Sequence, residues 1–208
     1  MRTQWLARVS GALAVWLLSG VGAWTVAEAA AASTLDNLQA TYQNDATTKA
    51  RYEAFAAKAD AEGYKGISSL FRAAAMSEGI RAEKHAAAIR KLGAEPKASL
   101  TTVETRSTRE NLAAALTNET AVKDTVYPGF IKQADAERNA VASRAFKGAI
   151  APAASRVKVY QQALKDLDSW RAPRDVLVCK VCAYITADTT VKRCPICEVP
   201  RSKFETVR

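Results

Sequence analysis

The sequence lacks several features that would point to common functions. Cysteine is absent before Cys179, so the four cysteines of the chain are confined to its C-terminal end and do not form an accidental grouping. Runs of β-branched residues are few between residues 33 and 168, and the Ala, Leu, Lys, Glu and Gln found there favour helices. No basic cluster is interleaved with aromatic residues, so nucleic acid is not an expected partner.

The cysteines form two pairs, Cys179-x-x-Cys182 and Cys194-Pro-x-Cys197, which are separated by eleven residues. The two-residue gap lets the backbone turn back, so that both sulfurs of a pair point at one centre. Four thiolates suit one tetrahedral ion, either zinc or a single iron, whereas a redox dithiol needs only one pair. Two disulfides are the alternative, because the N-terminus has the pattern of an export signal.

Residues 1–32 have the pattern of a bacterial secretory signal. Arg2 and Arg8 give a positive start, and Val9–Trp24 is an apolar run without charge. Ala27-Glu28-Ala29 then offers small residues at the spacing that a signal peptidase accepts. We therefore expect a periplasmic protein, exported before metal loading because no twin arginine is present. An uncleaved inner-membrane anchor is the alternative, and only then is membrane contact expected.

The formal net charge is +9. This charge is compatible with a basic surface that is simply solvated, or with a surface that favours anionic partners. The length beyond residue 32 allows one helical domain with a sizeable core. A small appendage at the C-terminus would need a metal to hold it together.

Hydrophobic residues at three- and four-residue intervals predict helices between residues 33 and 168. The first helix is expected to end at Gly63 and the second at Leu92-Gly93, because glycine closes a helix well. Residues 94–106 contain a proline and a threonine-rich stretch, which predicts a connection along the outside of the domain.

Ser107-x-x-Glu110 is a capping box that opens a third predicted helix, in which Pro128 predicts a kink. A fourth helix is expected from about Arg138 to Asp168. Two hairpins joined by a longer crossover describe a four-helix bundle.

Residues 169–175 break the helical pattern and are predicted to be a linker to a small domain, residues 176–208. Val176–Val178 and Tyr184-Ile185 are expected to form short strands beside the cysteine pairs. This unit is too small to fold by apolar burial alone, so a bound metal would have to supply much of its stability.

Four stretches of the mature chain together match the pattern of one protein family. They are Thr34-Leu-Asp-Asn-Leu-Gln-Ala40, Ser69-Leu-Phe-Arg-Ala-Ala74, Tyr127-Pro-x-Phe130-Ile-Lys-Gln-Ala134, and Cys194-Pro-x-Cys197 with Pro200 and Phe204 downstream. On these stretches the mature chain resembles the rubrerythrin family throughout. The resemblance implies a mainly α fold, in which a ferritin-like four-helix bundle (33–168) precedes a rubredoxin-like metal-binding domain with short β-strands.

Rubrerythrins hold two irons in the bundle by a lone Glu on the first helix, Glu-x-x-His on the second and fourth, and Glu-x-x-Glu on the third. Residues three apart share a helix face, so both reach the core. The resemblance places these positions at Asp45, Glu78, Arg81, Glu119, Val122, Ala153 and Arg156. Arginine replaces both histidines and offers no lone pair to a metal, which implies a bundle without a di-iron centre. His85, the only histidine, is expected to be a structural or surface residue.

These substitutions suggest a physical replacement for the cations. Arg81 and Arg156 are positioned to pair with up to three buried carboxylates, those of Asp45, Glu78 and Glu119, through hydrogen bonds. Unpaired charges there would cost several kcal/mol each. The alternative is that some of these side chains turn outward to water.

The resemblance implies one iron in the cysteine domain, with zinc as the alternative. Rubredoxin-like knuckles usually have glycine after each cysteine pair, where φ is positive. This chain has Ala183 and Glu198 there, at a cost of roughly 1–2 kcal/mol each.

Two functions are compatible with this sequence. In one, the protein transfers single electrons through its Fe(Cys)4 centre, and the bundle serves for dimerisation or docking without independent catalysis. In the other, it is a structural subunit of a larger assembly, with a zinc that only folds the tail. A peroxide-reducing enzyme of the family's kind needs the di-iron ligands of the bundle, and the resemblance implies that several of them are replaced in this chain. A homodimer is expected by analogy with the family.

Overall fold

A computed structural model describes residues 32–100 and 102–208 of the chain. The predicted signal or anchor segment, residues 1–32, therefore lies almost entirely outside the described residues. No helix among those described is long and apolar enough to cross a membrane.

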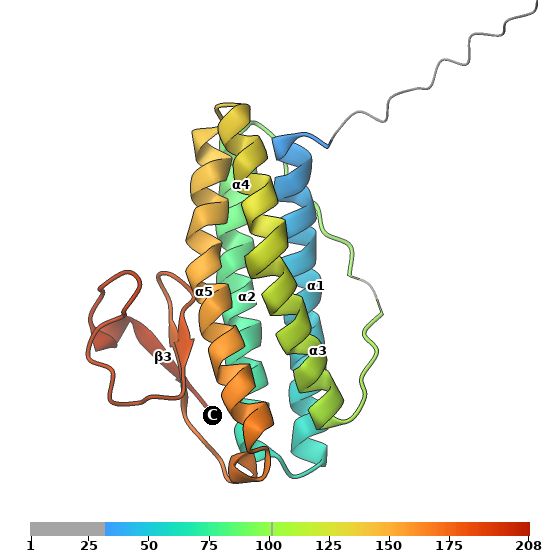
Figure 1. The fold of residues 1–208 in the computed structure, drawn as a ribbon, viewed down its shortest axis with the longest axis vertical. Coiled ribbons are helices and arrows are strands. Elements are labelled where there is room, and N and C mark those ends of the chain that lie inside the picture. The colour runs from blue at the N-terminus through green and yellow to red at the C-terminus, as the bar shows by residue number, and fades with distance from the viewer. Residues whose placement is uncertain (1–31, 101) are drawn as a thin grey trace, which may run out of the picture. The chain divides into compact units, whose positions relative to one another are not determined.

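The larger part of the described chain is a bundle in which five helices occupy four positions, because two of them follow one another along one rod (Figure 1). This architecture confirms the predicted ferritin-like bundle. Its helices are α1 (Thr34–Ala61), α2 (Lys65–Lys91), α3 (Thr108–Ala121), α4 (Tyr127–Ala136) and α5 (Ala140–Lys165).

The predicted helix ends are present. Gly63 and Gly93 follow α1 and α2 with φ of 78° and 79°, a left-handed conformation that glycine adopts without strain. The capping box of Ser107 and Glu110 starts α3, since each side chain bonds the backbone N–H of the other.

The third rod is interrupted by a π-helix just before Pro128, the residue at which the sequence predicted an interruption. Residues Val122–Val126 form this π-helix (η1), and the Tyr127 N–H bonds the Val122 carbonyl five residues back. Pro128 lies in the first turn of α4, where a missing N–H costs little. The π-helix and the proline therefore lie together at the point where α3 gives way to α4.

The last helix is shorter at both ends than the predicted Arg138–Asp168. Arg138 has a φ of 55°, which breaks the helical path. The side chain of Asn139 then accepts a hydrogen bond from the Ala142 N–H at 3.1 Å and starts α5 one residue later.

The crossover between α2 and α3 runs along the outside of the bundle, as predicted (Figure 1). Two glutamines one turn apart on α1 hold it. Gln39 bonds the Glu95 carbonyl at 2.7 Å and the Lys97 N–H at 3.1 Å. Gln43 accepts from the Ser99 N–H at 2.6 Å. Side-chain amides thus replace the backbone partners that an extended segment needs.

The predicted linker is packed against the bundle rather than free. Asp168–Trp170 form a 3-10 turn (η2), and Trp170 is only 4% exposed within the core. Gly66 on α2 permits this approach, because a Cβ at that position would lie 2.8 Å from the carbonyl oxygens of Trp170 and Ala172.

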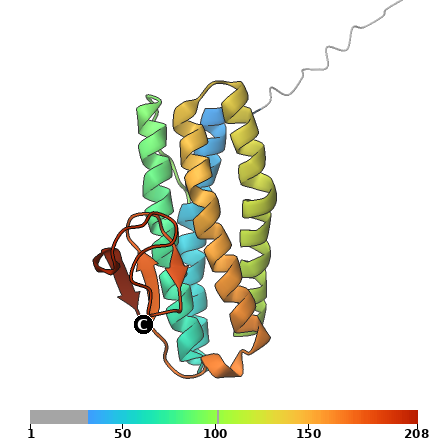
Figure 2. The same ribbon diagram turned by 60° about the vertical axis from the view of Figure 1, so that its left-hand side comes forward.

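The C-terminal domain contains a three-stranded antiparallel sheet in the order β2-β1-β3. The two predicted strands are present as β1 (Val176–Cys179) and β2 (Ile185–Thr186), and β3 (Phe204–Val207) is additional. In this sheet Val178 pairs with Ile185 and Cys179 with Phe204. The sheet lies against α2 and α5 (Figure 2).

Alternate residues of β1 have different surroundings. Val176 and Val178 belong to the apolar core of the bundle, together with Ile185 of β2. Leu177, which points the other way, packs with the cysteines and Phe204. The small domain therefore shares its core with the bundle on one face and encloses the cysteines on the other.

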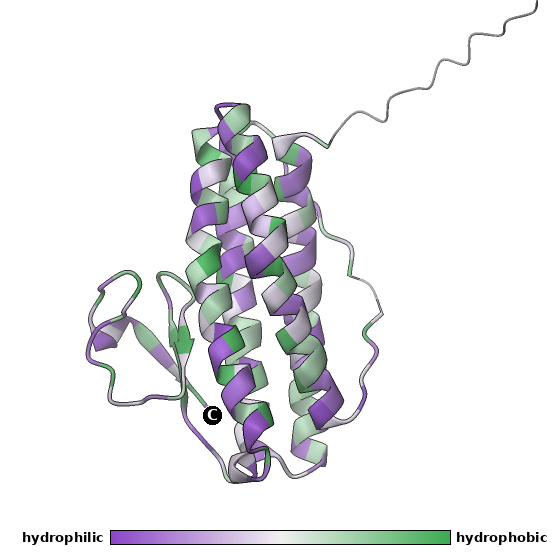
Figure 3. Ribbon diagram, in the orientation of Figure 1, coloured by the Kyte–Doolittle hydropathy of each residue, from purple (hydrophilic) through white to green (hydrophobic). Residues whose placement is uncertain are grey.

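The bundle core consists of two apolar clusters with a charged layer between them. On α1, Leu38 belongs to one cluster, Tyr52 belongs to the other, and the buried Asp45 lies between them. Hydrophilic and hydrophobic residues alternate at short intervals along the helices, as expected for helices with one buried and one exposed face (Figure 3). Apolar packing on both sides lets the fold tolerate a polar layer at its middle.

Candidate metal centre

The two cysteine knuckles have the same backbone geometry. Ala183 and Glu198, the residues after each pair, have φ of 71° and 58°, as the family resemblance implied. Their N–H groups donate to the carbonyls of Cys179 and Cys194, both at 2.9 Å. Each knuckle therefore closes as a tight turn despite lacking glycine.

The knuckles bring all four cysteine sulfurs within 4.8 Å of one another. The Sγ atoms of Cys182 and Cys194 are 3.4 Å apart, and those of Cys179 and Cys197 are 3.6 Å apart. These separations exceed the roughly 2.05 Å of a disulfide bond, and all four cysteines are free. They are close to the roughly 3.8 Å edge of a sulfur tetrahedron with metal–sulfur bonds of about 2.3 Å. The donor set therefore fits one tetrahedral ion.

Backbone amides around the sulfurs favour the thiolate that a metal needs. Burial raises the pKa of the Cys182 thiol, and a hydrogen bond from the Tyr184 backbone acts against it. Burial also acts to raise the pKa of Cys194, but hydrogen bonds from the backbone of Cys197 and Ile196 outweigh it and lower this pKa.

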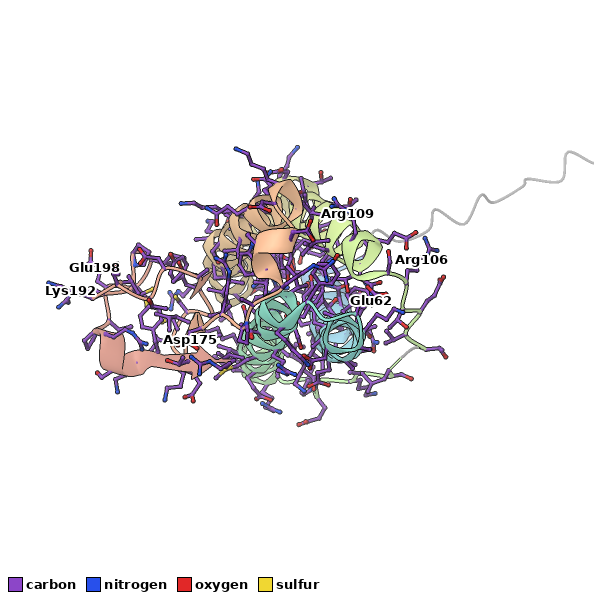
Figure 4. All side chains as sticks on the ribbon, turned by 90° about the horizontal axis from the view of Figure 1, so that it is seen from below. Glu62, Arg106, Arg109, Asp175, Lys192 and Glu198 are labelled. Atoms are coloured by element: carbon purple, nitrogen blue, oxygen red, sulfur yellow. The ribbon has the colours of Figure 1, made fainter. Side chains whose placement is uncertain are left out.

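One edge of the site faces outward. Cys197 is half-buried, whereas the other three cysteines are buried. Val181 and Ile196, which lie within the two knuckles, are 42% and 37% exposed. Lys192, beside the second knuckle, lies at the outer end of the small domain, far from the bundle (Figure 4).

The charged layer of the bundle contains the two arginines and three carboxylates named from the sequence. Arg81 contacts Asp45 at 2.5 Å and Glu78 at 3.1 Å. Arg156 donates from Nη2 to Oε2 of Glu119 at 2.9 Å, and its Nε lies 2.8 Å from Oε1. All five side chains are at most 3% exposed, so the predicted pairing is present and none of them turns outward.

Glu78 is the least well bonded member of this layer. Its two oxygens lie 3.1 Å from Arg81 and 3.2 Å from Arg156, but neither is aligned for a hydrogen bond. Burial raises the pKa of Glu78 despite both guanidinium groups. Burial also acts to raise the pKa of Asp45 and of Glu119, but their arginine partners hold both pKa values below the usual range.

The remaining positions named from the sequence adjoin this layer. His85 is a structural residue, 1% exposed, with Nδ1 2.7 Å from Oδ2 of Asp45. Val122 and Ala153 are buried and apolar. Within residues 32–100 and 102–208, the cysteines form the one group of His, Cys, Asp or Glu side chains whose donor atoms could surround an ion.

Two residues of this region could not be identified from the sequence. The Tyr52 hydroxyl donates to Oε1 of Glu119 at 3.0 Å. Ser77 accepts a hydrogen bond from Nη1 of Arg156 at 2.6 Å and donates to the Ala183 carbonyl at 2.7 Å. An isolated serine or tyrosine gives no signal in one sequence, because its partners come from other helices.

Fold and site together define a class of two-domain protein, a ferritin-like four-helix bundle joined to a rubredoxin-like four-cysteine domain. The sequence profile of the Rubrerythrin family matches residues 36–151, and that of its rubredoxin-like domain matches residues 178–205. The chain belongs to the rubrerythrin family.

Individual relatives agree with this assignment. Nigerythrin from Nitratidesulfovibrio vulgaris is 32% identical over 180 residues, which cover 84% of this chain and 87% of the relative. Rubrerythrin-2 from Clostridium acetobutylicum is 28% identical, with 84% and 96% covered. The solved structure of fully reduced, all-ferrous nigerythrin superposes with a TM-score of 0.78 at 29% identity, with 88% of this chain and 91% of that one covered.

Proposed function

We propose that this chain is an exported one-electron carrier, whose single iron is held by Cys179, Cys182, Cys194 and Cys197. The observation that carries the proposal is the gathering of four sulfurs within 4.8 Å, in a domain that matches the rubredoxin-like profile. Bound iron supplies one-electron exchange between its ferric and ferrous states. The chain contributes burial of three sulfurs, backbone hydrogen bonds to Cys182 and Cys194, and the placement of all four sulfurs within 4.8 Å of one another.

The bundle, in this proposal, holds no di-iron centre. Guanidinium groups occupy the space between the carboxylates and contact them at 2.5–3.2 Å. Because arginine stays protonated and has no lone pair, these residues do not fit a pair of irons. The bundle then serves as a mount for dimerisation or docking, and peroxide reduction by the family's route is not expected.

The exposed edge of the knuckles is where we expect a redox partner to bind. Val181 and Ile196 offer apolar contact beside the half-buried Cys197. The exposed basic side chains of the small domain are Lys180, Lys192, Arg193, Lys203 and Arg208, and its exposed acidic ones are Asp188, Glu198 and Glu205, so basic groups are in excess. A partner protein with an acidic face fits this surface, and its association should weaken as salt screens the charges.

Metal content tests the proposal directly. Protein purified from its native compartment should contain one iron per chain and be red when oxidised, and the colour should bleach on reduction. One zinc per colourless chain would favour the structural subunit. Three irons per chain, with peroxide turnover by the reduced protein, would overturn the proposed loss of the di-iron centre.

Export and dimerisation need separate tests. The mass of the protein from cells should show cleavage near residue 29, whereas an intact N-terminus in the membrane fraction would indicate an anchor. Sedimentation should give twice the mass of one chain, and a monomer would remove dimerisation from the proposal.

A further inference from the structure

A chain of hydrogen bonds joins the charged layer of the bundle to one cysteine knuckle. Arg156 donates from Nη1 to the Ser77 hydroxyl at 2.6 Å, and that hydroxyl donates to the Ala183 carbonyl at 2.7 Å. Arg156, Ser77 and Ala183 are all fully buried. We call this arrangement the serine bridge.

The direction of each bond in the serine bridge follows from the groups themselves. A guanidinium has donors only, so the Ser77 oxygen must be the acceptor from Arg156. A carbonyl has acceptors only, so the Ser77 hydrogen must point to Ala183. The positive charge of Arg156 therefore polarises the Ser77 hydroxyl, and this hydroxyl donates its hydrogen to the Ala183 carbonyl of the knuckle.

The peptide group that receives this bond also contacts a cysteine sulfur. The carbonyl of Ala183 and the N–H of Tyr184 belong to the same peptide unit, and the Tyr184 backbone hydrogen-bonds Cys182. Hydrogen bonds in a chain strengthen one another in a buried environment. A stronger bond at the carbonyl makes the N–H a stronger donor to sulfur.

We propose that Arg156 and Ser77 are positioning residues that raise the reduction potential of the metal bound at Cys182 by strengthening the Tyr184 hydrogen bond to its sulfur. This inference rests on the proposed function, because it concerns an iron in the four-cysteine site. Reduction adds negative charge to the sulfur shell, so a better donor stabilises the reduced state more than the oxidised one.

A second buried serine provides a matched control. Ser155 on α5 also connects the bundle to the small domain, since its hydroxyl accepts from the Ile185 N–H at 3.2 Å. That amide is the next one along the chain and does not bond a cysteine sulfur. Ser155→Ala therefore removes a contact of the same kind without weakening the donor to Cys182.

The experiment measures the midpoint potential of the iron-loaded full chain by potentiometric titration of its visible absorbance. Ser77→Ala should reduce the ratio of ferrous to ferric iron at a fixed potential threefold to tenfold, where tenfold corresponds to 59 mV for one electron. Ser155→Ala should change the ratio much less. Equal shifts in both variants, or none in Ser77→Ala, would overturn the inference.

Zinc-loaded protein gives a readout that does not depend on iron. The amide proton of Tyr184 should move upfield in Ser77→Ala, because its hydrogen bond weakens, and should stay in place in Ser155→Ala. An unmoved resonance in Ser77→Ala contradicts the serine bridge, including when that variant loads iron poorly. If the native protein contains only zinc, the proposed electron transfer is wrong. The Tyr184 amide resonance would then still show whether Ser77 strengthens the Tyr184 hydrogen bond to Cys182.

Discussion

The four-cysteine site and the charged layer of the bundle both gather acidic groups in the interior, yet they differ in how the negative charge is balanced. The cysteines come from one short stretch, residues 179–197, whereas the charged side chains come from four separate helices. At the knuckles, thiols with free lone pairs converge on a point that suits an ion. In the bundle, carboxylates converge on Arg81 and Arg156, which bring their own fixed charge. Buried anions need nearby positive charge, and either a metal or an arginine can supply it.

The difference also extends to what each domain needs in order to fold. The bundle has apolar clusters on both sides of its charged layer, so it does not depend on that layer for its core. The small domain has only a short sheet and a few apolar residues around its cysteines. We therefore expect removal of the metal to damage the small domain far more than loss of one ion pair in the charged layer damages the bundle.

The largest effect should follow from Cys194→Ser. Structural tetrathiolate sites contribute on the order of 10 kcal/mol of folding free energy, so the variant should lose its metal, and residues 176–208 should lose amide protection. Hydrogen exchange and metal analysis check this, with Val181→Ala as a control in the same domain. Retention of one metal per chain would show that three cysteines suffice.

A smaller loss of stability is expected from Arg81→Ala. It leaves the buried Asp45 without its guanidinium partner, which should cost about 3–5 kcal/mol of unfolding free energy. Urea denaturation measures the change, and Lys84→Ala removes an exposed charge from the same helix as a control. Equal effects of the two substitutions would mean that the buried pair contributes nothing specific.

Glu78→Gln should change how stability depends on pH. Burial raises the pKa of Glu78 above its ordinary 4.5, so the stability linked to its proton is complete below pH 4.5 and is lost as pH rises through the raised value. Glutamine mimics the protonated form. The variant should match the native protein near pH 4 and exceed it increasingly at higher pH, in urea titrations across that range. A difference that stays constant with pH would exclude proton uptake by Glu78.

The smallest effect is expected at an accessible carboxylate. Glu62 accepts the Thr108 N–H at the start of α3, and this bond lowers its pKa from 4.5 to about 2. Glu62 lies with Arg106 and Arg109 at one end of the bundle (Figure 4). Glu62→Gln should destabilise by about 0.5–1 kcal/mol above pH 4.5. The difference in stability between Glu62→Gln and the native protein should vanish as pH falls towards 2. If thermal melts show the same difference at low pH, the charge of Glu62 is not its cause.

The sequence was sufficient where one segment determines the structure by itself. Both glycine helix ends and the Ser107 capping box depend on neighbours along the chain. The four cysteines were identifiable for the same reason, since each pair forms one turn. The positive φ values of Ala183 and Glu198 were instead implied by the family resemblance.

The sequence was insufficient where partners come from elsewhere in the fold. The π-helix at Val122–Val126 and the strand Phe204–Val207 depend on packing that no local pattern encodes. Gln39 has the same limitation, because its partners lie 56 and 58 positions along the chain. The arginine pairing could be predicted only because the family resemblance aligned the helices.

The packing of Trp170 against α2 determines how far the C-terminal domain can reach. With Gly66 pressed against the connecting backbone, there is no slack for a tethered arm that swings between a donor and an acceptor. For the proposed electron carrier, this means that a redox partner has to come to the small domain, which stays at one fixed place on the bundle.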